Sequence, residues 1–148
     1  MKLAFDNEFS RGAIAGTLSA IVICLFLEVL EWAGLAKHCW LFMAGQAMFR
    51  FTHTFWEGAF AFLVHLGLGG FWGVVIAFLY SKVFSEDYLI SKGLLIGSAI
   101  FFLHIGLLAD VLHYPAKLRQ DPLTVFIIFL SYLIYGGLTS FILKKLAT

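Results

Sequence analysis

Eight ionisable side chains lie in or beside long apolar stretches of this chain, where each is costly to bury in lipid. Six of them form pairs three or four residues apart, so the members of each pair share a helix face. These six are Glu28, Glu31, His53, Glu57, Asp110 and His113. Carboxylates and imidazoles from facing helices build metal sites in helix bundles, and "DVLH" has acid-x-x-His spacing. The six are predicted to handle a divalent metal ion or protons; mutual pairing or solvation at helix ends is the alternative.

His65 and His104 lie deeper in their apolar stretches than the six. By helical rise, His65 is about 15 Å from the outer end of its stretch and His104 about 13 Å below His113. Two imidazoles at matching depth could be the axial ligands of a b-type haem, for which nearby glycines would make room. Those glycines are Gly67, Gly69, Gly70, Gly73, Gly97 and Gly106. A neutral, mutually hydrogen-bonded histidine pair is the favoured interpretation, and Ser98, Ser131, Tyr132 and Tyr135 are other available partners.

A polar stripe connects the six paired residues to the deeper histidine His65. His53, Glu57, Ala61 and His65 follow one another at four-residue steps, so they lie along one slowly winding helix face. The stripe predicts an inward-facing line from the outer cluster to a histidine in the middle of the membrane. A binding site or a short proton path needs such a line.

The elements that must position these residues are membrane-spanning helices. The 148 residues are 61% hydrophobic and 13% charged, with a mean hydropathy of +0.94. A soluble domain of this size could not hide so much apolar surface. Four stretches, at about 12–32, 55–80, 93–112 and 123–143, are long enough to span and too long for barrel strands. The sequence predicts an all-α integral membrane protein, one compact four-helix bundle over residues 1–148.

The segment between the first two spans, residues 33–54, is amphipathic and is predicted to be an interfacial helix on one membrane surface. Small residues recur at four-residue spacing within the spans, which lets helices approach closely in lipid. They include Gly12, Gly16, Ala20, Gly69, Gly73, Gly93, Gly97 and Gly136. This spacing predicts ordinary bundle packing.

Four spans place both termini on one side of the membrane. That side carries six lysines and arginines and the other side four, which favours cytoplasmic termini. A net charge of +1 with no basic run argues against nucleic acid as a partner. The expected partners are the lipid bilayer and a second copy or a larger membrane complex. With no nucleophile–base set and no phosphate loop, we do not expect an enzyme.

Three stretches of the chain are similar to a known family. They are "THTFWEGAFAFLVH", "GVVIAFLYSKVF" and "KGLLIGSAIFFLHIGLL". From His53 onward the pattern resembles the YagU/YqhR-like family of small bacterial membrane proteins, with His53, His65 and His104 at comparable places. That family often has a histidine in its fourth helix, where this chain has Tyr132 or Tyr135. The resemblance implies a four-helix protein of the bacterial inner membrane and no particular activity.

Three functions therefore stay open from the sequence. The first is metal or proton handling by the six clustered residues. The second is electron transfer through a haem held by His65 and His104. The third is an accessory or scaffold subunit whose polar residues serve packing alone.

Overall fold

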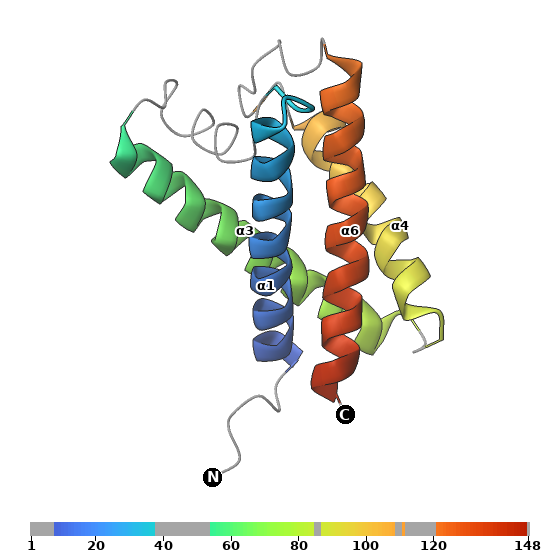
Figure 1. The fold of residues 1–148 in the computed structure, drawn as a ribbon. Helices are drawn as coiled ribbons and strands as arrows, with labels where there is room; N and C mark the ends of the chain where they lie inside the picture. The colour runs from blue at the N-terminus through green and yellow to red at the C-terminus, as the bar shows by residue number, and fades with distance from the viewer. Residues whose placement is uncertain (1–7, 38–53, 85–86, 109–110, 112–120, 148) are drawn as a thin grey trace.

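Four helical segments long and apolar enough to cross a membrane make up the fold (Figure 1). The computed structural model describes residues 8–37, 54–84, 87–108, 111 and 121–147. The helices are α1 (Glu8–Trp32), α3 (Phe55–Lys82), α4 (Leu89–Phe101), which continues as the π-helix η1 (Phe102–Leu107), and α6 (Pro122–Ala147). The described part contains no strand. The predicted all-α fold with four spans is confirmed.

Local sequence explains where these helices begin and end. Thr54 and Glu57 form a capping box at the start of α3, in which each side chain accepts the other residue's backbone N–H. Gly34, with φ of 73°, follows the end of α1 in the left-handed conformation that glycine adopts most readily. Pro122 occupies the first position of α6, as its missing N–H favours. The third span begins at Leu89, four residues before the predicted Gly93.

The helices pack as two close pairs, α1 with α3 and α4 with α6, and α1 joins the pairs by contacting α6. The predicted small residues make both close approaches. A Cβ added at Gly16 would lie 2.7 Å from the Gly73 Cα, and closer still to the Gly69 carbonyl oxygen. At the second crossing, a Cβ at Gly136 would lie 2.9 Å from the Gly97 nitrogen. Side chains any larger would hold the helices apart.

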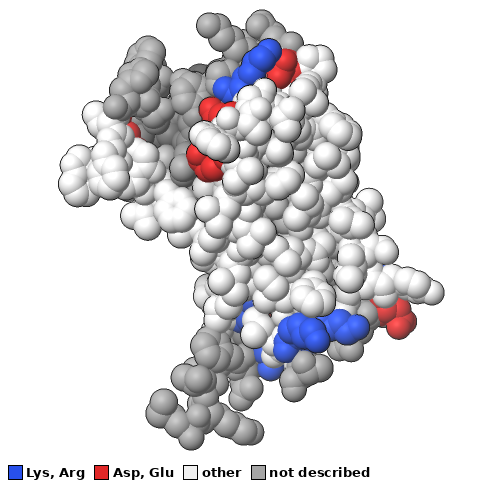
Figure 2. Space-filling model, in the orientation of Figure 1, with Lys and Arg blue, Asp and Glu red and all other residues white. Residues whose placement is uncertain are grey.

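The arrangement puts both chain ends at the same end of the bundle, while α3 crosses α1 obliquely (Figure 1). Figure 2 shows charged residues at the two ends of the molecule and an uncharged band between them. Large apolar side chains face outward within that band, including Leu25, Leu63, Leu95 and Phe102, each more than 60% exposed. A bilayer is the solvent that such a surface requires, so this is a multi-pass membrane protein. Residues 38–53, most of the predicted interfacial helix, lie outside the described part.

Candidate functional site

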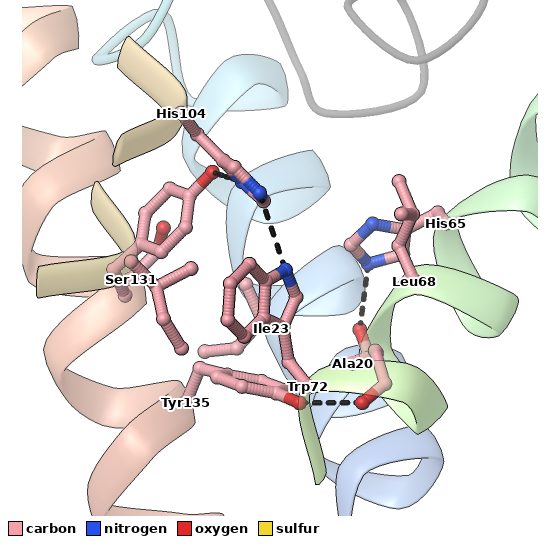
Figure 3. A pocket seen from close by; sticks show the side chains of 11 residues that line it. Ala20, Ile23, His65, Leu68, Trp72, His104, Ser131 and Tyr135 are labelled. Atoms are coloured by element: carbon pink, nitrogen blue, oxygen red, sulfur yellow. Dashed lines mark hydrogen bonds between the residues drawn. The ribbon is translucent and has the colours of Figure 1, made fainter. Parts of the chain in front are cut away.

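A small cavity with an almost entirely apolar lining surface lies where the four helical segments meet. Its volume is about 40 Å³, and its lining includes side chains from α1, α3, α4, η1 and α6 (Figure 3). Its polar lining consists of His65, Trp72, His104, Ser131, Tyr132 and Tyr135. One water molecule needs roughly 10–15 Å³ of such space, so the cavity has the volume of about three waters, but the surface it offers them is almost entirely apolar.

His104 has defined partners on both ring nitrogens. The Trp72 indole N–H donates to His104 Nε2 at 3.2 Å, and an indole nitrogen can only donate. Nε2 is therefore an acceptor, and the imidazole in this arrangement is neutral with its proton on Nδ1. That N–H donates to the Tyr132 hydroxyl oxygen at 2.8 Å. The Trp72 and Tyr132 rings also meet the imidazole edge to face, with centroids 5.5 and 5.8 Å away.

The backbone around His104 is unusual. In η1 the hydrogen bonds span five residues, as in the bond from the Leu108 N–H to the Leu103 carbonyl at 2.9 Å. Segments of π-helix are rare and occur frequently at functional sites. His104 is the third of the six residues in η1 and is buried against the cavity. The hydropathy of residues 93–112 predicts one continuous span and gives no sign of this π-helical segment.

His65 approaches the same cavity from α3. Its Nε2 lies 3.1 Å from the Ala20 carbonyl oxygen, which can only accept, so this nitrogen carries a proton. The Tyr135 hydroxyl donates to the Gly69 carbonyl, one turn further along α3. These two bonds fasten α3 to α1 and to α6. The favoured prediction of a mutually hydrogen-bonded histidine pair is wrong, because His65 bonds to the Ala20 carbonyl and the two nitrogens of His104 bond to Trp72 and Tyr132.

The six residues of the predicted outer cluster are only partly described. Glu28 and Glu31 are half-buried near the end of α1, and Glu57 is half-buried at the start of α3. Glu57 accepts the Thr54 backbone N–H at 3.0 Å, so it serves as a helix cap. His53, Asp110 and His113 lie outside the described residues. Among the residues that are described, no three His, Cys, Asp or Glu side chains group as metal ligands, and the metal site stays a prediction.

The surroundings of His65 and His104 do not fit a haem in this structure. The cavity of about 40 Å³ is far below the roughly 300–1,000 Å³ of pockets that hold larger ligands. Both ring nitrogens of His104 are already hydrogen-bonded, Nε2 to the Trp72 N–H and Nδ1 to the Tyr132 hydroxyl, so neither is available to ligate iron. Four of the six glycines are occupied by helix contacts, because Gly69, Gly70 and Gly73 meet α1 and Gly97 meets α6. Gly67 and Gly106 have open space beside them, but they do not line the cavity. We therefore derive no chemistry through haem.

Sequence reasoning found some members of this site and missed others. Tyr132 was among the predicted partners for a buried histidine, and it bonds to His104. Trp72 was not singled out, although a buried indole N–H needs an acceptor, and a histidine is a suitable one. The Thr54-x-x-Glu57 pattern at the start of α3 was a readable capping signal that gives Glu57 a structural role.

Comparison of the chain with protein-family models, with curated proteins and with solved structures finds no match in any of the three. The similarity to the YagU/YqhR-like family therefore stays a prediction.

Proposed function

We propose that this multi-pass membrane protein handles protons at the cavity between His65 and His104. The observation that carries the proposal is that imidazoles from two different helical segments, α3 and η1, border one small cavity between the helices. Ionisable groups at such depth are costly and are functional candidates by default. Imidazole is suited to the role because one ring nitrogen can accept a proton while the other releases one.

The hydrogen bonds define what a proton transfer must change. Nε2 of His104 can accept a proton only when the Trp72 N–H moves away from it. The imidazolium formed in this way donates from both nitrogens, and the Tyr132 hydroxyl oxygen, to which Nδ1 is hydrogen-bonded, can take the Nδ1 proton only if Tyr132 releases its own hydroxyl proton in the same step. Proton uptake at His104 is therefore coupled to displacement of the Trp72 indole.

The site is separated from the outer carboxylates. Glu28 lies eight residues beyond Ala20 on α1, and Glu57 lies eight residues before His65 on α3. Each separation is about 12 Å along a helix. Buried apolar side chains, among them Ile23 and Leu27, occupy this stretch of α1. These distances favour a gated, stepwise relay over a continuously open pore.

The test is proton flux into vesicles containing the purified protein. A potassium gradient with valinomycin sets the membrane potential, and a trapped pH-sensitive dye reports internal acidification. The wild type is expected to exceed protein-free vesicles, and His65→Gln with His104→Gln to reduce the flux to the protein-free level. Glutamine keeps hydrogen-bonding groups but cannot titrate. Ser131→Ala is the matched control, because Ser131 lines the same cavity and its hydroxyl bonds to its own helix at Ile128. Wild-type flux in the double variant would refute the proposal.

A second candidate is an accessory or scaffold subunit, in a homo-oligomer or a larger membrane complex. The observation that favours it is that His65, Trp72, His104 and Tyr135 each bond to protein groups, as packing residues do. In this role the wild type would not exceed protein-free vesicles, and the histidine variants would lose folding stability alone.

We also propose that both termini lie in the cytoplasm of a bacterial cell, with the protein in the inner membrane. Among the described residues, five lysines and arginines lie at the end with the termini, and Lys37 alone lies at the other (Figure 2). The positive end of a membrane protein faces the cytoplasm. A C-terminal green fluorescent protein fusion should fluoresce; a dark fusion of normal abundance would reverse the orientation.

A further inference from the structure

A second, larger hollow lies at the end of the bundle that carries both termini. It measures about 390 Å³ and lies between the start of α4 and the end of α6. Its lining consists of residues 88–91 together with Phe141, Lys144 and Lys145. Its volume is in the range of pockets that hold small ligands.

The lining combines two kinds of chemistry. Leu89, Ile90 and Phe141 supply apolar surface, and Ile90 and Phe141 are 53% and 45% exposed. Lys144 and Lys145 supply two cationic groups in the last turn of α6. The ammonium of Lys145 lies 5.9 Å from the centre of the Phe141 ring, so charge and apolar surface are adjacent. An occupant that satisfies both must have an anionic part and an apolar part.

The position of the hollow relative to the membrane indicates which kind of molecule could occupy it. It lies where the apolar span of α6 gives way to charged residues, which is the depth at which phospholipid phosphates meet acyl chains. Basic residues gather at this end of the molecule (Figure 2). Basic pockets between membrane helices on the cytoplasmic side bind phosphate-bearing lipid headgroups.

We propose that this hollow binds one anionic phospholipid. Lys144 and Lys145 contact its phosphate, and its acyl chains lie along Ile90 and Phe141. A soluble anion would leave the apolar side chains of the hollow exposed to water. A zwitterionic lipid would bring its own cation toward the two lysines, so the net charge of the headgroup decides the preference. This site is independent of the proton-handling cavity.

The experiment is a lipid titration of the full-length protein in detergent, read by native mass spectrometry. The probes are phosphatidylglycerol and phosphatidylcholine with identical acyl chains. The wild type is expected to take up one phosphatidylglycerol in preference to phosphatidylcholine. Near a membrane surface each lysine contributes about fivefold to anionic lipid binding, so removing both should reduce the preference by roughly 25-fold, to near unity.

The matched pair of variants is Lys144→Gln with Lys145→Gln against Lys82→Gln with Lys92→Gln. Both lower the net charge by two at the same end of the bundle, but Lys82 and Lys92 do not line the hollow. The proposal requires the first pair to lose the preference and the second to keep it. Equal losses would mean attraction to the basic end as a whole, and no loss would mean binding elsewhere; either result overturns the site. Thermal unfolding in phosphatidylcholine checks that both double variants fold. If one of the double variants does not fold, its two single lysine variants are tested in its place. Displacement of the lipid by inorganic phosphate at equal concentration would identify a free anion as the ligand and overturn the lipid assignment.

Discussion

Gly16→Ala should separate α1 from α3 and destabilise the whole bundle. The new methyl carbon would lie 2.7 Å from the Gly73 Cα, where ordinary contact begins at 3.4 Å. The obstructing atoms are backbone, so no side chain can rotate aside, and the helices must move apart by at least about 0.7 Å at the crossing, since the Gly69 carbonyl oxygen lies closer than the Gly73 Cα. Overpacking of this kind lowers the free energy of unfolding by about 1–3 kcal/mol.

The same displacement should reach the candidate site. Ala20 lies one turn beyond Gly16 on α1, and its carbonyl accepts the His65 N–H at 3.1 Å. Moving the helices apart by at least about 0.7 Å would lengthen this bond to roughly 3.8 Å or more, beyond the range of a hydrogen bond. We therefore expect Gly16→Ala to weaken proton handling as well as folding.

The assay is equilibrium unfolding in mixed dodecylmaltoside and dodecyl sulfate micelles, followed by circular dichroism. Gly67→Ala is the matched control, because a Cβ at Gly67 has open space around it. Both changes gain the same helix propensity, up to about 1 kcal/mol, so that gain cancels between them. The difference between the two variants then reports the overpacking alone. If they unfold within about 0.5 kcal/mol of each other, the close approach of α1 and α3 is not what holds the pair together.

Two further predictions concern single polar contacts. Trp72→Phe keeps an aromatic ring but removes the N–H donor to His104. Buried polar contacts in membrane bundles contribute about 0.6 kcal/mol on average, so we expect the free energy of unfolding in the same micelles to fall by that order and by less than about 2 kcal/mol. An unchanged free energy of unfolding would mean that the bond does not stabilise the fold. At the other contact, the Lys37 ammonium, 2.8 Å from the Asp121 carboxylate, and the Thr124 hydroxyl lower the pKa of Asp121 from 3.8 to about 2. A carboxylate with a lowered folded-state pKa stabilises the fold above its unfolded pKa and loses that effect as pH falls. Asp121→Asn keeps a good helix cap but removes the charge. The variant should therefore be less stable than the wild type at pH 7, and this difference in the free energy of unfolding should shrink between pH 4 and pH 2. A difference that does not change with pH would exclude the ion pair as its source.

The positions of the helices follow from local sequence. Length and hydropathy predict four spans because a bilayer selects for about 20 consecutive apolar residues regardless of what they contact. The capping box at Thr54 and the proline at the start of α6 are local signals in the same sense. Even the burial of His65 could be expected from its place on a stripe with Ala61, which is fully buried.

The partners of the buried histidines could not be predicted in this way. Helices α1, α3 and α6 have almost no separation of apolar and polar faces, so their sequences give little indication of which face turns inward. The sequence could therefore suggest a histidine pair or a haem as readily as a bond from Trp72. The tertiary structure decides among these because the close approaches at Gly16 and Gly136 fix how far each helix is rotated and how near its neighbour it lies. Those distances leave about 40 Å³ beside His104, which is too little for a macrocycle. The sequence by itself determined that the chain crosses a membrane four times with ionisable groups inside it; the packing of glycine backbones determined what those groups can reach.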